Sequence, residues 1–352
     1  MRSALRILDA NANRAREALR VMEDYARFSL DDAALSGAIK RLRHDLRKCL
    51  PDALHGALVR SRDIVADVGR DVSTDAERSR ETSQDVAIAA CKRLSEALRS
   101  MEEYGKTLDA GLAASLERLR YAGYELERRL RITMSARKRL AGIRLYVLIT
   151  QALCATEWLT TAEAALRGGA DCLQLREKTL PDAELMTRAV RLTALCHEHG
   201  ALCIINDRVD IATVSGADGV HLGQDDVPVA HARRVLPPAA IVGLSTHTRE
   251  QFDTSVNAAP DYIAIGPMFA SSTKPQGYVA GIEALAQAKG RTALPLVAIG
   301  GITARNADTV LATAPCCLCV CSSVISQPDA TEACRRLITR IEAQRGAEDA
   351  DK

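Results

Sequence analysis

The chain has few aromatic residues and little net charge, and both restrict what it can bind. Phenylalanine, tryptophan and tyrosine make up 3% of its 352 residues, and the formal net charge is +2. A nucleic-acid surface usually combines a basic patch with aromatic rings that stack on bases. We therefore expect no nucleic-acid partner.

Long apolar runs are also missing from the sequence. No stretch approaches the roughly 20 apolar residues of a membrane-spanning helix. The N-terminal segment is interrupted by Asp9, Asn11 and Asn13, so it lacks the apolar core of a signal peptide. These features predict a soluble, cytoplasmic protein with no membrane partner. The eleven cysteines are scattered at positions typical of buried strands and helices, which favours free thiols over disulfides.

The two halves of the chain follow different patterns, as expected for a length that suits two domains. Up to residue 138, apolar residues recur every three or four positions, as in amphipathic helices. Within this half, Glu17–Arg27 (EALRVMEDYAR) recurs as Glu96–Lys106 (EALRSMEEYGK), and a further helical segment with Arg-Leu-Arg follows each copy. We predict an all-α bundle domain of two duplicated helical hairpins over residues 1–138.

From Leu145 onward, short β-rich runs alternate with helical segments about every 25 residues. Eight such units in a row predict an α/β fold, a (β/α)8 TIM barrel over residues 139–347, with its active site at the carboxyl ends of the strands. The predicted strands are Leu145–Thr150, Cys172–Lys178, Ala201–Asp207, Gly219–Gln224, Ile241–His247, Tyr262–Met268, Pro295–Ile302 and Cys317–Ile325.

Polar residues at the end of the second predicted strand are the first candidates for this site. In Gln174–Lys178 (QLREK), Gln174, Arg176 and Lys178 occupy alternate positions, so they would share one face and converge on the barrel mouth. The alternative is that Arg176 and Lys178 belong to a buried salt-bridge network.

Two aspartates lie at the ends of the third and fourth predicted strands. Asp207 comes after Asn206, and Asp226 lies just beyond Gln224. Oxygen ligands from two strand ends suit Mg²⁺, which takes one or two carboxylates plus water and phosphate oxygens. The alternative for each aspartate is the N-cap of the helix that follows.

The later strand ends carry groups suited to phosphate. A hydroxyl-rich loop closed by Lys274 follows the sixth strand, and Gly301 and Ser323 lie at the ends of the seventh and eighth. The mouth would then hold two phosphate-binding regions, which fits two phosphorylated substrates or one bisphosphate.

With these residues in hand, residues 145 to about 340 resemble thiamine-phosphate synthase. The motifs are QLREK, Asn206-Asp207, Gly223-Gln224 followed by Asp226, the GLSTH segment ending at His247, Thr273-Lys274, and Gly300-Gly301. All six in order are far more specific than any one alone. The family joins 4-amino-2-methyl-5-(diphosphooxymethyl)pyrimidine to a methylthiazole ethyl phosphate, after the bond to diphosphate has ionised.

The resemblance implies roles for individual residues. Arg176, Lys178, Lys274 and Ser245 would be catalytic, and Asp207 and Asp226 would bind Mg²⁺. The substrate-binding set would be Gln174, Leu175, Arg176, Glu177, Lys178, Asn206, Ser245, Ser271, Thr273, Lys274, Gly301, Ser322 and Ser323. The chain departs from the family pattern at Ser271, where threonine is usual, and at Ser322, where an apolar residue is usual.

Some assignments stay open at this point. A thiazole tautomerase, a related barrel isomerase in which a histidine near His247 transfers protons, is the alternative activity. His221 is interpreted as a packed strand residue.

The helical half resembles a domain linked to phosphorylation of the pyrimidine phosphate by ATP. It lacks a GxxxxGK[ST] loop, and a homodimerisation bundle is the alternative. Its candidate residues are Asn13, Arg14, Arg16, Glu17, Arg62 and Asp63.

Overall fold

The computed structural model describes residues 2–50, 52–62, 80–270 and 278–350. Contacts divide the chain into two compact units, Met1–Met134 with Gly290–Ala293, and Ser135–Lys289 with Leu294–Lys352. The division falls within helix α6 (Ala110–Leu140), and the boundary after residue 138 stays a prediction. None of the helices in these ranges combines the length and apolarity that a bilayer span requires.

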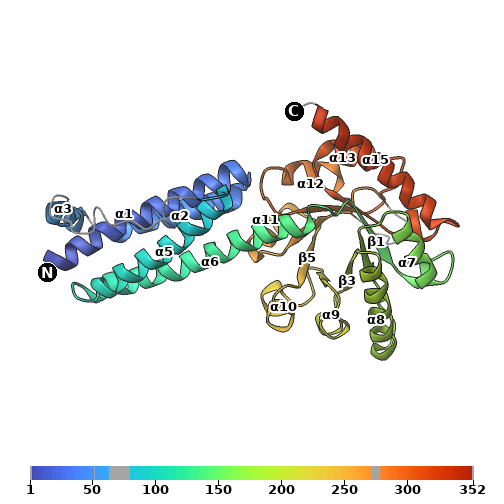
Figure 1. Cartoon of the computed structure of the whole chain (residues 1–352), viewed down its shortest axis with the longest axis horizontal. Coiled ribbons are helices and arrows are strands. Elements are labelled where there is room, and N and C mark those ends of the chain that lie inside the picture. The colour runs from blue at the N-terminus through green and yellow to red at the C-terminus, as the bar shows by residue number, and fades with distance from the viewer. Residues whose placement is uncertain (1, 51, 63–79, 271–277, 351–352) are drawn as a thin grey trace. The chain divides into compact units, whose positions relative to one another are not determined.

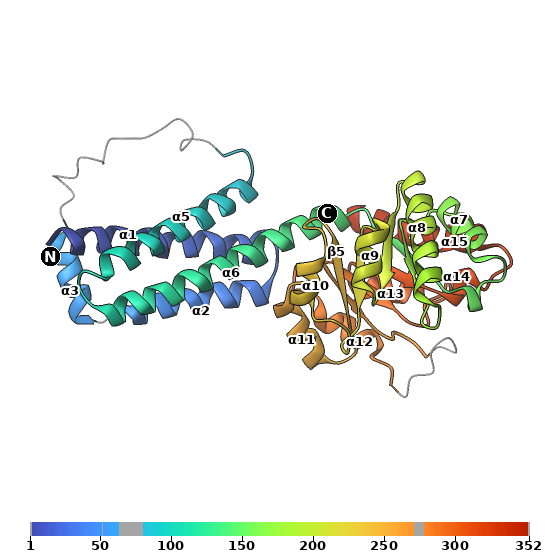
Figure 2. The same ribbon diagram turned by 90° about the horizontal axis from the view of Figure 1, so that it is seen from below.

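The first unit is helical throughout its described part, as predicted, and Figures 1 and 2 show its long helices side by side. Helix α1 packs against α2, α3 and α5. The helices are α1 (Arg2–Asp24), which continues as a π-helical turn (Tyr25–Ser29), α2 (Ala33–Cys49), α3 (Asp52–Ser61), α5 (Ser83–Gly105) and α6.

The internal repeat corresponds to the two central helices of this unit. Glu17–Arg27 lies in α1 and its π-helical extension, and Glu96–Lys106 lies in α5 and its C-cap. Buried alanines such as Ala15 on α1 and Ala90 on α5 belong to one core, and small side chains let helices approach closely. Asn11 on α1 also donates a hydrogen bond to Ser100 on α5, at 3.1 Å. The two helices that carry the repeat therefore pack closely against each other.

The second unit is a closed barrel of eight parallel strands in chain order, confirming the predicted fold. Strand β1 pairs with β2 and also with β8, which closes the barrel. The strands are β1 (Leu145–Ile149), β2 (Cys172–Leu175), β3 (Leu202–Asn206), β4 (Gly219–Leu222), β5 (Ile241–Thr246), β6 (Tyr262–Ile265), β7 (Leu296–Ile299) and β8 (Cys317–Val320).

Helices surround the strands on the outside of the barrel (Figures 1 and 2). They are α7 (Trp158–Arg167), α8 (Asp182–Glu198), α9 (Val209–Ser215), α10 (Val229–Val235), α11 (Arg249–Ala258), α12 (Gly281–Ala288), α13 (Ala307–Thr313), α14 (Ser322–Ile325) and α15 (Ala330–Ala350), with a short 3-10 turn at Gln151–Leu153.

The strands are shorter than the sequence analysis predicts, and the difference matters most at β2. This strand ends at Leu175, so Arg176 and Lys178 follow it in a loop and do not continue its alternation. The prediction that they share a strand face with Gln174 is wrong in that detail. Strand β2 ends at this residue because its ladder pairing to β1 and β3 stops at Leu175.

The barrel interior is filled by alternate residues of the strands, including Tyr146, Cys172, Ile204, Tyr262 and Cys319. All eleven cysteines are free, as predicted, and burial raises the pKa of the Cys172, Cys317 and Cys319 thiols well above its usual value. These thiols therefore stay protonated and act as small apolar side chains.

Candidate active site at the carboxyl ends of the barrel strands

Arg176 stands at the barrel mouth with its backbone fixed and its charge unpaired. Its N–H donates to the Ile149 carbonyl at 2.9 Å, and its own carbonyl accepts from the Thr150 hydroxyl at 2.8 Å. Its guanidinium forms no salt bridge with any residue in the described ranges. The salt-bridge alternative therefore finds no partner for Arg176 in that part of the chain.

The other residues of the segment divide between the site and the helix layer. Lys178 Nζ lies 3.2 Å from Asp207 Oδ2 and is more than half exposed. Glu177 turns outward, where its Oε1 accepts from the Gln151 N–H at 2.7 Å and lies 3.3 Å from Arg188 Nη1 on α8. Leu175 is buried. The predicted substrate contacts of Leu175 and Glu177 are not explained by these side-chain positions.

The two aspartates are held by local backbone contacts and lie next to each other. Asp207 has a φ of 62°, and its N–H donates to the His221 carbonyl at 2.8 Å. Asp226 Oδ2 accepts from the Gly223 N–H at 2.7 Å. Burial and the adjacent Asp226 carboxylate raise the pKa of Asp207, against the opposing charge of Lys178.

Neither aspartate caps a helix, so that alternative is wrong. The N-cap residue of α9 is Arg208 and that of α10 is Pro228, and neither helix has a side-chain cap. Asp207 and Asp226 thus keep oxygen atoms available at the mouth.

A magnesium ion suits this pair of carboxylates. Two adjacent, partly buried carboxylates repel each other, and a divalent cation would relieve the repulsion. Within the described ranges there is no cluster of three or more His, Cys, Asp or Glu side chains arranged for a metal. Mg²⁺ commonly takes only one or two carboxylates and completes its shell with water and phosphate oxygens, so the pair fits Mg²⁺ better than a metal that needs a full protein cage.

A polar group of side chains lies deeper in the barrel. Gln174 is buried and donates from Nε2 to the Tyr146 hydroxyl at 2.6 Å. Ser245 Oγ lies 2.7 Å from His221 Nε2. Asn206 is the last residue of β3 and pairs in register with His221. Gln174, Asn206 and Ser245 were predicted for this mouth and come from β2, β3 and β5.

His221, Tyr146 and Tyr262 were not predicted as site residues. His221 is buried, in agreement with its interpretation as a packed strand residue, but both of its ring nitrogens have polar partners. The available signal was the two-residue period of a strand. His221 lies two residues after Gly219, so both occupy the same face of β4.

On the other side of the mouth lie a tightly packed glycine, Gly301, and the buried hydroxyl of Ser323. Gly301 has a φ of +67°, and a Cβ there would lie 2.7 Å from the Phe269 carbonyl oxygen, so only glycine fits. Ser323 Oγ on α14 is buried and has no hydrogen-bond partner among the described residues; Ser322 precedes it on the same helix. Ser271, Thr273 and Lys274 lie outside the described residues.

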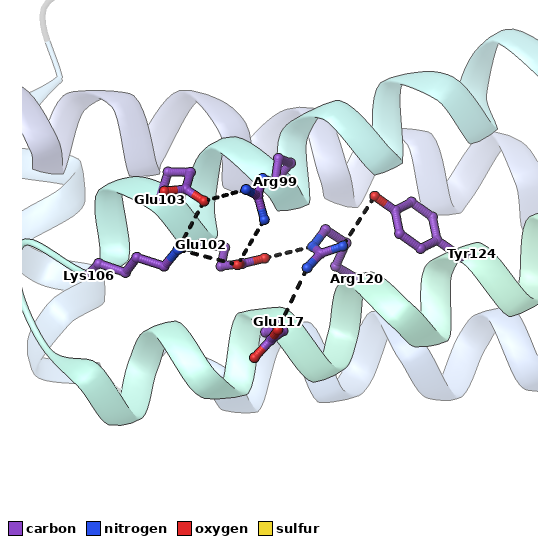
Figure 3. Close-up of polar contacts among 7 residues, drawn as sticks. All are labelled: Arg99, Glu102, Glu103, Lys106, Glu117, Arg120 and Tyr124. Atoms are coloured by element: carbon purple, nitrogen blue, oxygen red, sulfur yellow. Dashed lines mark hydrogen bonds and ion pairs between the residues drawn. The ribbon is translucent and has the colours of Figure 1, made fainter.

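The helical unit contains a buried ionic network, shown in Figure 3. Glu102 on α5 accepts from Arg120 Nε on α6 at 2.6 Å and also pairs with Arg99 and Lys106. Arg120 Nη1 donates to the Tyr124 hydroxyl at 3.3 Å. Although burial opposes it, the hydrogen bond from Arg120 and the neighbouring cations hold the pKa of Glu102 below its usual value.

The first copy of the repeat carries an equivalent pair. Glu23 corresponds to Glu102 in the repeat, and its Oε2 lies 3.2 Å from Arg43 Nη2, although the angle gives Oε2 no hydrogen bond. Arg43 and Arg120 are the last residues of the two Arg-Leu-Arg segments. The duplication thus preserves one ion pair between the two helices of each hairpin.

Some of the candidate residues of the helical unit lie at a further ion pair, between Asp9 and Arg62. Arg62 donates to both carboxylate oxygens of Asp9, at 2.7 and 2.8 Å. Asn13 donates to the Asp9 carbonyl and accepts from Arg16. Arg14 and Glu17 are exposed on α1, and Asp63 lies outside the described residues.

Cations, carboxylates and close-packed glycines gather at the carboxyl ends of the strands of this closed parallel barrel. This arrangement defines a (β/α)8-barrel enzyme. Residues 145–324 match the family model described as thiamine monophosphate synthase, and residues 6–129 match the model of the ThiD2 family. The chain belongs to the thiamine monophosphate synthase family.

Relatives extend the match over both units. The chain is 39% identical to a thiamine-phosphate synthase of Thermosynechococcus vestitus, with 96% of this chain and 94% of that protein covered. It is 42% identical to a thiamine-phosphate synthase of Rhodopirellula baltica, covering 88% and 85%. A solved thiamine phosphate pyrophosphorylase from Pyrococcus furiosus is 32% identical with a TM-score of 0.54, and covers 57% of this chain and 96% of its own.

Proposed function

We propose that the barrel is a Mg²⁺-dependent transferase that condenses 4-amino-2-methyl-5-(diphosphooxymethyl)pyrimidine with 4-methyl-5-(2-phosphoethyl)thiazole, giving thiamine phosphate and diphosphate. The observation that carries this proposal is the contact of Lys178 with the Asp207–Asp226 pair, together with Arg176, which follows β2 and has no salt bridge to a described residue. A tautomerase releases no diphosphate, so it would not need this combination of groups.

The proposed reaction breaks the bond between the pyrimidine methylene carbon and the diphosphate oxygen, which leaves with the electron pair. The thiazole nitrogen then donates its lone pair to that carbon. Arg176 and Lys178, together with Lys274, would neutralise the charge that builds on the departing diphosphate. Mg²⁺ held by Asp207 and Asp226 supplies further neutralisation when bound. No side-chain nucleophile is needed.

The remaining residues would orient the two substrates. Gln174, Asn206 and Ser245 would hold the pyrimidine. Thr273, Gly301 and Ser323 would hold the thiazole phosphate, with Ser271 and Ser322 beside them. The buried, unsatisfied hydroxyl of Ser323 supports this assignment because a phosphate oxygen would give it a partner.

The full-length protein with both substrates and Mg²⁺ tests the reaction. We expect thiamine phosphate and diphosphate in equal amounts, and neither product when one substrate is omitted or Mg²⁺ is chelated. Isomerisation of a thiazole phosphate without diphosphate release would contradict the proposal and favour the tautomerase.

A second activity is proposed for the helical unit, because residues 6–129 match the ThiD2 family. We propose that this unit phosphorylates the pyrimidine monophosphate with ATP, supplying the diphosphate substrate of the barrel. Asn13, Arg14, Arg16, Glu17 and Arg62 are its candidate residues.

The full-length protein, given ATP and the pyrimidine monophosphate, should form ADP and the pyrimidine diphosphate. Arg62→Ala should reduce this reaction, whereas Arg335→Ala, which alters an exposed arginine on α15, should not. Absence of ADP formation by folded wild-type protein would contradict the kinase. Sedimentation velocity would then test the alternative role in a homodimer.

A further inference from the structure

Five side chains form a continuous hydrogen-bonded chain across the barrel interior, which we call the interior relay. Gln174 Nε2 lies 2.6 Å from the Tyr146 hydroxyl, and that hydroxyl lies 3.1 Å from the Tyr262 hydroxyl. The Tyr262 hydroxyl lies 2.9 Å from His221 Nδ1, and His221 Nε2 lies 2.7 Å from Ser245 Oγ. The relay therefore joins Gln174 and Ser245, two residues assigned to the pyrimidine, through three residues that are not.

The middle of the relay is fixed by packing. The His221 and Tyr262 rings stack with centroids 5.5 Å apart and planes 18° apart. A Cβ on Gly243 would lie 2.0 Å from Tyr262 Cζ and 2.4 Å from its hydroxyl oxygen. Glycine at position 243 is thus required for the Tyr262 ring to cross the interior and reach His221.

The protonation states of the three middle residues follow from burial and from their partners. Desolvation raises the pKa of Tyr146 and Tyr262 well above the usual value, so both phenols keep their protons. Each phenol then offers one proton. Each ring nitrogen of His221 faces a neutral hydroxyl, at 2.9 and 2.7 Å, so a neutral imidazole can donate from one nitrogen and accept at the other.

Counting protons gives the relay a direction. If Gln174 donates to Tyr146, then Tyr146 donates to Tyr262, Tyr262 donates to His221 Nδ1, and His221 donates from Nε2 to Ser245. Every hydroxyl and imidazole proton between Gln174 and Ser245 is then used, and the hydroxyl proton left over is that of Ser245. In the opposite direction, Ser245 donates to His221 and the unused proton belongs to the buried Tyr146. A buried donor without a partner is unfavourable, so the first direction is preferred.

We propose that Tyr146, Tyr262 and His221 are positioning residues that make Ser245 Oγ a hydrogen-bond donor and leave Gln174 Oε1 as an acceptor. The inference rests on the proposed function of the barrel. A 4-aminopyrimidine presents an amine that donates and ring nitrogens that accept, which complements this pair. A 4-oxopyrimidine accepts at position 4 and carries a ring N–H, so it mismatches both groups. The relay is thereby a specificity device for the amino form.

The first experiment measures the histidine tautomer in substrate-free, full-length protein labelled with ¹⁵N-histidine. Two-bond ¹H–¹⁵N spectra distinguish Nε2–H from Nδ1–H imidazole. His221 is recognised as the resonance that is lost in His221→Asn. We expect the Nε2–H tautomer. An Nδ1–H tautomer would overturn the proposed direction.

The second experiment compares kcat/KM for the 4-amino and 4-oxo pyrimidine diphosphates in wild type and Tyr262→Phe, which keeps the ring but removes the hydroxyl. We expect the amino-to-oxo ratio to fall by about tenfold or more, since a site loses discrimination when its polar groups lose their orientation. The KM for the thiazole phosphate should change little. Tyr104→Phe, at an exposed tyrosine of α5, is the matched control.

A purely structural role for Tyr262 would lower stability and slow both pyrimidines alike, so an unchanged ratio in Tyr262→Phe would overturn the specificity claim. Absence of turnover by the wild type would contradict the proposed function instead. The tautomer measurement would still decide the direction of the relay, because it requires no substrate.

Discussion

Glu102 in the helical unit and Arg176 at the barrel mouth are both charged side chains held by ordered backbone, but their surroundings differ. Glu102 is buried and contacts three cations, one of them the buried Arg120 (Figure 3). Arg176 is partly exposed and has no anionic partner among the described residues. The charge of Glu102 is neutralised by the protein itself and serves the fold, whereas the charge of Arg176 remains available to a ligand at the mouth.

The two copies of the repeat refine this comparison. The Glu23–Arg43 pair has the same place in its hairpin as Glu102–Arg120, but it is longer and more exposed, with side chains 15% and 24% accessible against 4% and 8%. Desolvation makes a broken pair costly only where the surviving charge is buried.

The largest effect is therefore expected from Glu102→Ala. It leaves Arg120 buried without its main anion, and the helical unit should lose about 3–5 kcal/mol of stability. The matched variant Glu23→Ala should cost only about 1 kcal/mol because its pair is more solvated. Urea denaturation followed by circular dichroism measures both, and equal losses would contradict the distinction between the two copies.

Arg176→Ala should affect activity and leave the fold intact. We expect kcat/KM for thiamine phosphate formation to fall about 10²–10³-fold, the range for loss of one preorganised electrostatic contact. The melting temperature should be unchanged, as in the control Arg335→Ala. A lower melting temperature with retained turnover would mean that Arg176 has a structural partner.

Gly243→Ala should give an intermediate effect that links barrel packing to the site. The added methyl group collides with the Tyr262 ring, and overpacking of this kind costs about 1–3 kcal/mol. Gly142→Ala, where a Cβ meets nothing within 4 Å, serves as the control. Similar denaturation midpoints for the two variants would show that Tyr262 can move aside without cost.

The smallest effect concerns acid pH. Because the folded pKa of Glu102 lies below its usual value of 4.5, its contribution to stability is complete above about pH 4.5 and is lost as pH falls towards the folded pKa. Thermal melts of wild type between pH 6 and pH 3.5 should show this loss. Glu102→Gln, which cannot titrate, should show a shallower decline, and parallel curves would contradict the assignment.

The sequence was sufficient for the barrel because eight β-rich runs with regular spacing leave few other folds. It also located Arg176, Lys178, Asp207 and Asp226 at one mouth, since carboxyl ends of parallel strands meet there. It could not tell that β2 ends at Leu175, because QLREK continues the alternation beyond the point where ladder pairing stops.

The interior relay was beyond the sequence for a different reason. Tyr146, His221 and Tyr262 lie on β1, β4 and β6, and only the register of the closed barrel brings their polar atoms within 3.1 Å of one another. The helical unit presents the same difficulty: the repeat predicted two hairpins, but Glu102 and Arg120 become partners only once α5 packs on α6.

The central claim is that the mouth cations and the aspartate pair receive a diphosphate. Isothermal titration of the full-length protein with inorganic diphosphate in the presence of Mg²⁺ tests it directly, without turnover. The account predicts one site per chain, loss of binding when Mg²⁺ is chelated, and at least tenfold weaker affinity in Arg176→Ala, the loss that follows from removing roughly 1.4 kcal/mol of interaction. Equal affinity in wild type and Arg176→Ala, or binding that does not depend on Mg²⁺, would contradict it.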